Sequence, residues 1–162
     1  MTDKTNSANS PSPAASAADD RVNAMRQRMQ EEMAEIGVTM QFIDDLVEEF
    51  YARIRQHPAL GPVFNNKVED WPHHLETLKR FWASVVLHAG LYSGKPMVAH
   101  AQVPDIKPNH FAVWLGLFEA TLKDIAPNET VVNVFMDRAN RIAHSLKLGL
   151  FYHPGNNPTS NP

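Results

Sequence analysis

The chain has 162 residues, enough for one domain with a substantial core, and contains no cysteine, which excludes disulfides, thiolate catalysis and iron–sulfur clusters. Its formal net charge of −3 and pI near 6.2 give no basic surface, so we do not expect nucleic acid as a partner. No apolar run reaches the ~18 residues of a membrane span and the N-terminus lacks the apolar core of a secretory signal, so we expect a cytoplasmic protein that does not enter the membrane.

The first 20 residues are rich in Ser, Ala, Asn and Pro and hold no large apolar side chain after Met1, so residues 1–20 are predicted to form a disordered extension. A helix is predicted over about residues 20–36, because large apolar residues recur there at helical spacing and Gly37 suits its end. Its apolar face consists of Val22, Met25, Met29, Met33 and Ile36. A face this thin and rich in methionine indicates a helix on the domain surface or one that meets a partner.

A second helix is predicted from about Met40 to Gln56, with acidic side chains along its solvated face. Its buried stripe consists of Ile43, Val47, Phe50, Tyr51 and Ile54. Tyr51 therefore lies on the inner face, where its hydroxyl needs a hydrogen-bond partner. The prolines and glycine that follow end the helix, and Phe64 is expected to insert into the core from a turn.

The third helix is predicted to begin at Trp71, with Asp70 as its cap. Its apolar stripe is formed by Trp71, Leu75, Leu78, Trp82 and Val85. His74 lies on the same stripe, where a histidine is more often a satisfied core residue than a ligand. The glycines and prolines after Leu87 predict a long irregular loop that reaches Asn109. Loops of this length are uncommon in compact domains unless they have a function, and this one carries Tyr92, Met97 and His100.

Two further helices complete the domain. Asn109 is expected to cap a helix that reaches about Ile125, and Asn128 to cap a last helix that ends near Phe151. The core face of the first of these contains Phe111, Trp114, Leu115, Phe118 and Leu122. Residues 152–162 are predicted to be a flexible tail. Since no segment alternates as a strand would, the domain is predicted to be all-α.

Several side chains with polar groups converge on this core from separate elements. Tyr51, His74 and Trp114 come from three helices, and His100 comes from the loop. Each unpaired polar group buried in a dry core costs ~1–3 kcal/mol, so a bound cofactor that carries a polar ligand would satisfy them together. His110, four residues before Trp114, is the alternative to His100 as a ligand-binding imidazole.

At these residues the sequence resembles a known family. The motifs are Phe50-Tyr51, Leu60-Gly61-Pro62-Val63-Phe64, Trp71-x-x-His74, Phe81-Trp82, Tyr92-Ser93-Gly94-Lys95-Pro96 followed by His100, and His110-Phe111-x-x-Trp114-Leu115-x-Leu117-Phe118. They resemble the truncated haemoglobins of group III over roughly Phe42 to Phe151. The resemblance implies a globin-like domain over residues 21–151, built as a two-on-two helical sandwich with a long irregular proximal loop.

The resemblance also implies a cofactor, haem b (iron protoporphyrin IX), bound non-covalently. By position, His100 becomes the proximal iron ligand, while Tyr51 and Trp114 become distal donors to a diatomic ligand. His74 takes the distal helix position and is expected to act as a gate. The walls of the haem pocket are implied to be Phe64, Leu78, Phe81, Trp82, Tyr92, Met97 and Phe111.

The expected function is therefore binding of dioxygen and related diatomics such as CO and NO. Two donors in a dry pocket predict slow ligand release, which favours redox chemistry on the ligand, with a reductase as partner, or sensing, over bulk oxygen delivery. Whether such redox chemistry makes the protein an enzyme is left open. The alternatives are a haem-free helical interaction module and a sensor in which residues 1–40 relay the ligation state to a partner.

Overall fold

The computed structural model describes residues 13–152, and within that range the chain forms helices and loops without any strand. The helices are α1 (Pro13–Ile36), α2 (Met40–Gln56), α3 (Leu60–Asn65), α4 (Trp71–Leu87), α5 (Pro96–Ala101), α6 (Pro108–Ile125) and α7 (Glu129–Phe151). The predicted all-α class is confirmed. None of the described helices is both long and apolar enough to cross a membrane.

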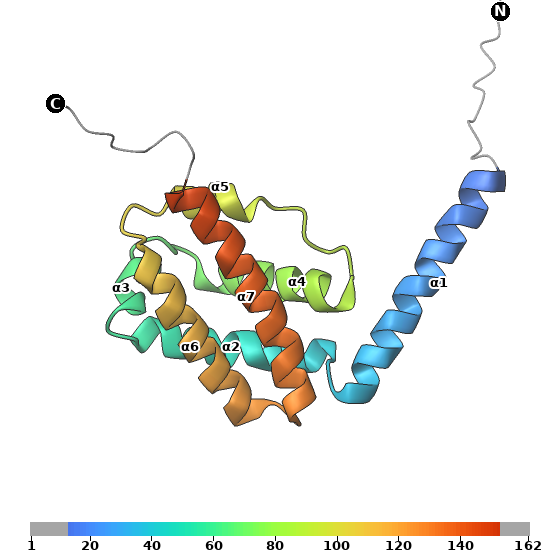
Figure 1. Ribbon diagram of the computed structural model, residues 1–162, viewed down its shortest axis with the longest axis horizontal. Coiled ribbons are helices and arrows are strands. Elements are labelled where there is room, and N and C mark those ends of the chain that lie inside the picture. The colour runs from blue at the N-terminus through green and yellow to red at the C-terminus, as the bar shows by residue number, and fades with distance from the viewer. Residues whose placement is uncertain (1–12, 153–162) are drawn as a thin grey trace, which may run out of the picture.

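The four long helices after α1 are arranged as two crossing pairs. Helices α6 and α7 run side by side across α2 and α4, as Figure 1 shows. Phe50 of α2 packs edge-on against Phe118 of α6, and Trp82 of α4 stacks on the same Phe118 with ring centroids 5.1 Å apart. Phe135 of α7 closes this core from the other side. The apolar stripes read from the sequence therefore meet between the two pairs, which is the predicted two-on-two sandwich.

Side chains at the helix starts fix where three of these helices begin. Thr39, Asp70 and Asn128 each accept a hydrogen bond from a backbone N–H of the first turn, at 3.0–3.1 Å. The starts of α4 and α7 thus agree with the prediction. Helix α6 differs, because it begins at Pro108 with Lys107, and not Asn109, at the cap position. Proline suits that first turn, since its missing N–H has no helical partner there.

The expected disorder of residues 1–20 is wrong for the part that the structure describes. Helix α1 begins at Pro13, well before the expected start near residue 20. The segment between these points is rich in alanine, which has the highest helix propensity and loses no side-chain entropy on folding, so it extends the helix without needing a core. Residues 1–12, and residues 153–162 of the predicted tail, lie outside the described range.

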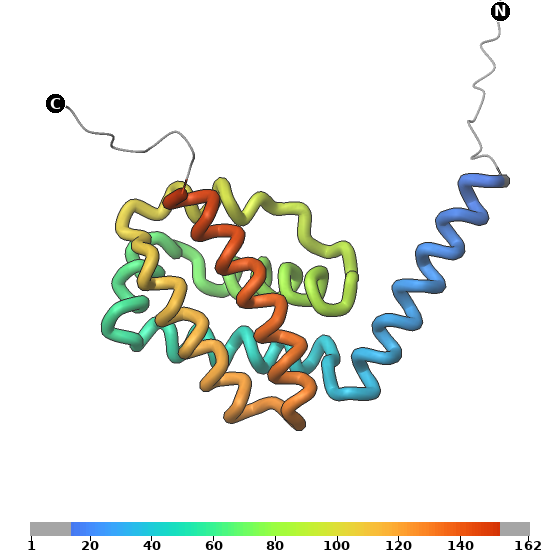
Figure 2. Tube along the Cα trace, viewed as in Figure 1, coloured from blue at the N-terminus to red at the C-terminus, as the bar shows by residue number. Residues whose placement is uncertain are grey.

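Two short helices also replace expected irregular structure. Helix α3 forms in the turn region that carries Phe64, and α5 forms inside the long loop that carries His100. Both contain a proline in their first turns, where its fixed φ favours the helix. The path from α4 to α5 is irregular as expected, and Figure 2 shows it running back from the end of α4 to the C-terminal end of α7.

Helix α1 projects from the rest of the molecule (Figures 1 and 2). Only its C-terminal end packs on the core, through Met33 and Ile36. Gln30 Nε2 donates a hydrogen bond to the Leu87 carbonyl at the end of α4, at 3.1 Å. Gly37, with φ +105°, then turns the chain into α2 in a conformation that glycine adopts without strain.

The side chain of Asn128 hydrogen-bonds both to the first turn of α7 and to the end of α1, so we expect it to stabilise the fold. Its Oδ1 accepts from Val131 N–H at 3.0 Å, and its Nδ2 donates to the Ile36 carbonyl at 2.8 Å. Asn128→Ala removes both bonds and should lower the free energy of unfolding by about 1–2 kcal/mol in urea unfolding. Asn128→Asp, which keeps the capping acceptor but loses the donor, should lose less. Wild-type stability in Asn128→Asp would contradict a separate role for the bond to Ile36.

Candidate functional site

A cavity of about 290 Å³ lies between α4, α5, α6 and α7, close to α2. It is lined by Tyr51, Leu60, Phe64, His74, Thr77, Leu78, Phe81, Trp82, Tyr92, Pro96, Ala99, His100, Ile106, His110, Phe111, Trp114, Ala139, Ile142, Ala143 and Leu146. All the predicted site residues except Met97 are in this set. Its walls are mostly apolar with a few convergent polar groups, which is typical of small-molecule and cofactor sites.

Met97 does not line the cavity, so its predicted place in the wall is not what the structure shows. It packs instead beside Gly149 of α7 and against the small cluster around Phe111. The reason is the short helix α5, which places Pro96, Ala99 and His100 on its cavity face. At 3.6 residues per turn, position 97 falls on a different face, which points to α7.

Tyr51 and Trp114 form the polar part of the cavity between α2 and α6. Tyr51 is only 4% exposed, and it lines the cavity together with Trp114. Burial raises the pKa of the Tyr51 hydroxyl above its ordinary value, because the phenolate would lose its hydration, and the neighbouring Trp114 side chain offsets part of this. Tyr51 therefore keeps its proton and can donate it in a hydrogen bond to a ligand.

His74 carries an unsatisfied nitrogen. Its Nε2 is the one buried side-chain nitrogen or oxygen within residues 13–152 that has no hydrogen-bond partner. The ring packs edge-on against Tyr51 and Trp71, at centroid distances of 6.0 and 5.6 Å. Burial lowers the pKa of His74, and the nearby His100 and His73 lower it further, so the ring is neutral near pH 7. An orphaned nitrogen in a cavity wall is a position where a bound group would supply the missing partner.

Hydrogen bonds distinguish the two candidate imidazole ligands. His100 Nδ1 lies 2.7 Å from the Pro96 carbonyl oxygen, and since that oxygen only accepts, Nδ1 holds the proton and Nε2 keeps its lone pair. His110 shows the reverse pattern, because its Nδ1 accepts from the Lys107 N–H at 3.1 Å. Neutral His110 therefore carries its proton on Nε2. Of these two rings, only His100 offers a free Nε2 lone pair for a metal.

The loop before α5 is hydrogen-bonded to α4 beside this cavity. Ser84 Oγ of α4 accepts hydrogen bonds from the backbone N–H groups of Leu91 and Tyr92, at 2.9 and 3.0 Å. Tyr92 then packs edge-on against Phe81 at a centroid distance of 5.2 Å. The irregular segment thus holds an aromatic wall in a defined position, and it leads directly into the helix that carries His100.

The wall on the α7 side was not predicted as part of the site. Ala139, Ile142 and Ala143 of α7 line the cavity on this side. The signal that could have identified this wall is the pair of small residues on a buried helix face. Alanines there leave space that larger side chains would have filled.

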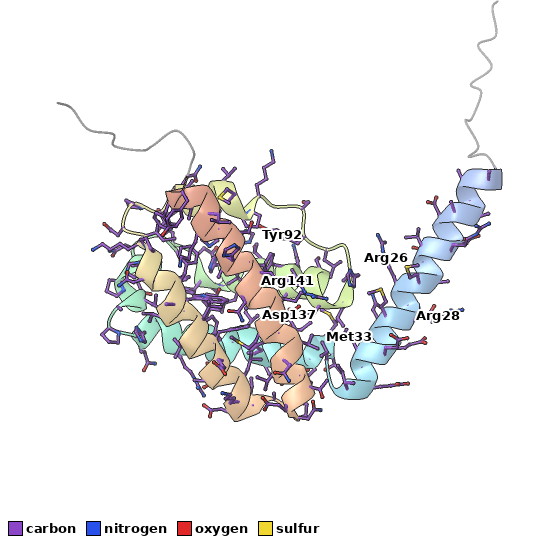
Figure 3. The ribbon with its side chains drawn as sticks, in the orientation of Figure 1. Arg26, Arg28, Met33, Tyr92, Asp137 and Arg141 are labelled. Carbon is purple, nitrogen blue, oxygen red and sulfur yellow. The ribbon has the colours of Figure 1, made fainter. Side chains whose placement is uncertain are left out.

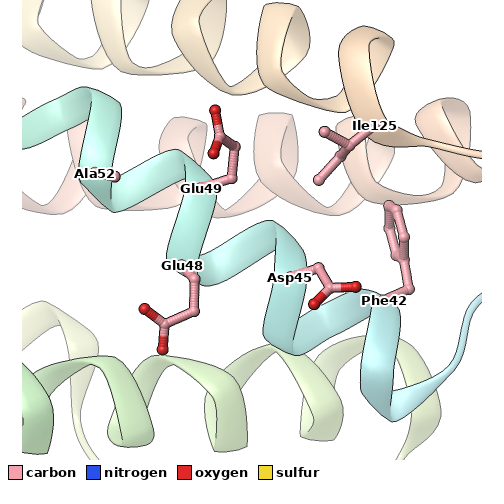
Figure 4. Close-up of a pocket in the computed structure, with 6 residues that line it drawn as sticks. All are labelled: Phe42, Asp45, Glu48, Glu49, Ala52 and Ile125. Atoms are coloured by element: carbon pink, nitrogen blue, oxygen red, sulfur yellow. The ribbon is translucent and has the colours of Figure 1, made fainter.

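A second hollow lies along the acidic face of α2, and Figure 4 shows Glu49 directed toward α6 and Glu48 directed toward α4. These groups have protein partners. Glu48 pairs with Lys79 of α4 at 2.7 Å, and Glu49 pairs with Arg53 at 2.7 Å. This is the solvated face expected from the sequence.

The side chains that line the main cavity favour a metal that is already coordinated by a cofactor. The described part of the chain contains no group of three or more His, Asp or Glu residues that could hold a bare metal ion. One imidazole with a free lone pair, aromatic walls and two hydrogen-bond donors suit an iron porphyrin, whose ring nitrogens already occupy four coordination positions.

Comparison with known proteins agrees with this geometry. Residues 33–147 match the model of a family described as bacterial-like globin. A group 3 truncated hemoglobin of Campylobacter jejuni, ctb, is 35% identical over 122 residues, which cover 73% of this chain and 95% of that protein. The chain belongs to the group III truncated haemoglobins. A crystal structure of a group III truncated hemoglobin from the same organism matches with a TM-score of 0.68 and 34% identity, covering 73% of this chain and 95% of that one.

Membership of this family identifies the class of cofactor and ligand that the protein binds. As a globin, this truncated haemoglobin is a haem-binding protein of the class that binds diatomic ligands. The match to the globin family begins at residue 33, so most of α1 precedes the globin domain.

Proposed function

We propose that this truncated haemoglobin binds haem b non-covalently in the main cavity, with Nε2 of His100 as the proximal iron ligand. The observation that carries this assignment is the opposite hydrogen bonding of the two candidate rings. The Pro96 carbonyl holds the His100 proton on Nδ1, whereas the Lys107 N–H directs the His110 proton to Nε2. A carbonyl acceptor at Nδ1 also increases the basicity of the ligating nitrogen.

Tyr51 and Trp114 are proposed to donate hydrogen bonds to a diatomic ligand such as dioxygen, CO or NO. Ferrous haem, when bound, supplies a metal that takes up such a ligand and passes negative charge to it. The Tyr51 hydroxyl is held protonated by burial, and the Trp114 indole N–H is a second donor in the wall of the same cavity. In a site without bulk water these two donors stabilise developing negative charge more strongly than they would in water.

His74 is proposed to act as a gate between solvent and the distal side. Its Nε2 is buried without a partner, and the ring lies at the start of α4 next to Trp71. A neutral ring without a hydrogen bond that holds it can rotate at little energetic cost. Such rotation would open and close the route to Tyr51 without moving the helix.

Strong donors and a gate together favour slow ligand release, and we propose ligand redox chemistry or sensing as the role of the site, not bulk oxygen delivery. Chemistry on the ligand requires electrons from outside the chain, so a reductase is the proposed partner. A cytoplasmic setting, with its supply of reduced nicotinamide cofactors, fits this requirement.

Titration of the purified protein with haemin tests the proposal. We expect saturation at one haemin per chain, with a sharp Soret band and quenching of the tryptophan fluorescence, since Trp82 and Trp114 line the cavity. A protein that leaves the haemin spectrum unchanged would refute the proposal and would support the alternative of a haem-free helical interaction module.

A further inference from the structure

The side chain of Arg55 stacks on an aromatic ring beside the proposed gate residue His74. Its guanidinium carbon lies 4.6 Å from the centroid of the Trp71 ring. A guanidinium group in this position is attracted by the negative face of the indole, and its plane can stack on the ring. Arg55 belongs to the last turn of α2 and Trp71 to the first turn of α4, so the contact joins the two helices that carry Tyr51 and His74.

Trp71 lies between Arg55 and the gate residue. Its ring packs edge-on against His74 at a centroid distance of 5.6 Å and lies 6.3 Å from the ring of Tyr51. Tyr51 and His74 line the main cavity, whereas Trp71 is half-buried and does not line it. Arg55 is exposed. The order from the cavity to solvent is therefore Tyr51 and His74, then Trp71, then Arg55.

The packing around His74 sets how easily its ring turns, because its buried Nε2 has no hydrogen-bond partner among the described residues. Tyr51, one of the two aromatic rings against it, is buried and also packs edge-on against Phe64 at 5.8 Å. Trp71 is the less buried of the two, so it is the neighbour that can move outward and leave room for the His74 ring. The guanidinium group of Arg55 lies on the Trp71 ring and opposes that movement.

The backbone of Arg55 is held in place, and its charge is available for the Trp71 ring. Its carbonyl oxygen accepts a hydrogen bond from Asn65 Nδ2 of α3 at 3.2 Å. The ion pairs found among residues 13–152 do not include Arg55, whereas the neighbouring Arg53 pairs with two carboxylates. The contact with Trp71 is therefore the one that orients the guanidinium group.

We propose that Arg55 is a positioning residue for the distal gate. By holding the Trp71 ring in place, it slows the outward rotation of His74 and with it the entry of a diatomic ligand. The role of Arg55 rests on the proposed role of His74 as a gate, and it adds a residue that does not line the cavity. Removing the guanidinium group should change the rate at which any ligand enters, and not the strength of its hydrogen bonds to Tyr51 and Trp114.

Laser flash photolysis of the full-length, CO-bound protein measures the association rate. CO suits this test because it takes up little negative charge and so depends less on the distal donors. Arg55→Met keeps the length of the side chain but removes the charge, and it should speed CO association about 2- to 5-fold, the range that a cation–π contact at an exposed site supports. Arg55→Lys keeps a cation and should stay closer to the wild-type rate. His74→Ala removes the gate and should accelerate association at least as much as Arg55→Met.

Two controls separate this contact from a general loss of charge or packing. Arg141 forms an exposed ion pair with Asp137 on α7, and Figure 3 shows both residues on that helix. Because such surface pairs contribute little stability, Arg141→Met should leave the CO association rate and the melting temperature unchanged. Trp71→Leu removes the ring that Arg55 holds. It should accelerate association by itself, and Arg55→Met should add nothing in that background.

Fluorine NMR of the CO-bound protein labelled with 5-fluorotryptophan follows the Trp71 ring without any reaction at the haem. The chain has three tryptophans, and Trp71→Leu assigns one resonance. Arg55→Met should shift this resonance and leave those of Trp82 and Trp114 in place, because the guanidinium group lies on Trp71. Arg55→Lys should return the resonance toward its wild-type position.

The CO association rates distinguish failure of the Arg55 role from failure of the gate. A wild-type rate in Arg55→Met, with faster association in His74→Ala, would overturn the role of Arg55 and leave the gate intact. Equal acceleration in Arg55→Met and Arg55→Lys would also overturn it, since the cation would then not matter. Wild-type rates in both Arg55→Met and His74→Ala would refute the gate and the role of Arg55 together, although haem binding itself would stand.

Discussion

Replacing His100 by alanine is expected to abolish stable haem binding, whereas His110→Ala should retain it. Of these two rings, only His100 has a free Nε2 lone pair, because its Nδ1 proton is bonded to the Pro96 carbonyl. Loss of a group that only orients a metal ligand typically costs ~10–100-fold in affinity, and loss of the ligand itself should cost more. Transfer of haem from each variant to an excess of apomyoglobin, followed at the Soret band, measures the effect.

Two controls separate loss of the ligand from loss of the fold. Free imidazole should restore haem binding to the His100→Ala protein if the cavity is intact, because the small ring can take the vacated position. His110→Ala removes the acceptor for the Lys107 N–H and should lower stability slightly, with an unchanged haem spectrum. Retention of haem by His100→Ala together with its loss from His110→Ala would transfer the proximal role to His110.

Dioxygen release is expected to accelerate in both Tyr51→Phe and Trp114→Phe. Each substitution removes one donor from a cavity that is otherwise mostly apolar, and one hydrogen bond to a charged group is worth about 1–3 kcal/mol, or roughly 5- to 150-fold in rate. Since Tyr51 and Trp114 line one cavity and are proposed to contact the same ligand, the two effects should not be additive in the double variant. Stopped-flow measurement of dioxygen displacement by CO gives the rates.

Release of CO provides the matched control in the same variants. CO accepts much less negative charge from iron than dioxygen does, so its release rate should change less than that of dioxygen. If both single variants release dioxygen at the wild-type rate, the donors do not contact the ligand. Equal acceleration for both gases would indicate a widened exit route, and not the loss of a hydrogen bond.

The sequence predicted the helices well where a local signal and a long apolar stripe agree. Asp70 and Asn128 begin α4 and α7 as expected, because a side-chain cap needs only its own first turn. The stripes of α2 and α6 placed Tyr51 and Trp114 on inner faces, and the structure brings both to one cavity. The roles of these residues came from the family resemblance, since periodicity alone indicated only a helical domain with a ligand pocket.

Features that depend on short segments were not predictable in the same way. The six residues of α5 carry too little periodicity to be recognised, yet its turn decides that His100 faces the cavity and Met97 faces α7. The family resemblance favoured His100 over His110, but the physical reason lies in backbone groups of Pro96 and Lys107, which no pattern of side chains reveals. The early start of α1 was missed because alanine extends a helix without leaving an apolar stripe.

The crystal structure of the full-length protein with haem bound is the most direct test of the proposed site. We expect an iron atom bonded to Nε2 of His100, with Nδ1 of the same ring still donating to the Pro96 carbonyl and with Tyr51 and Trp114 on the opposite face of the porphyrin. Iron bonded to His110, or a porphyrin bound outside the cavity while side chains fill that space, would contradict it.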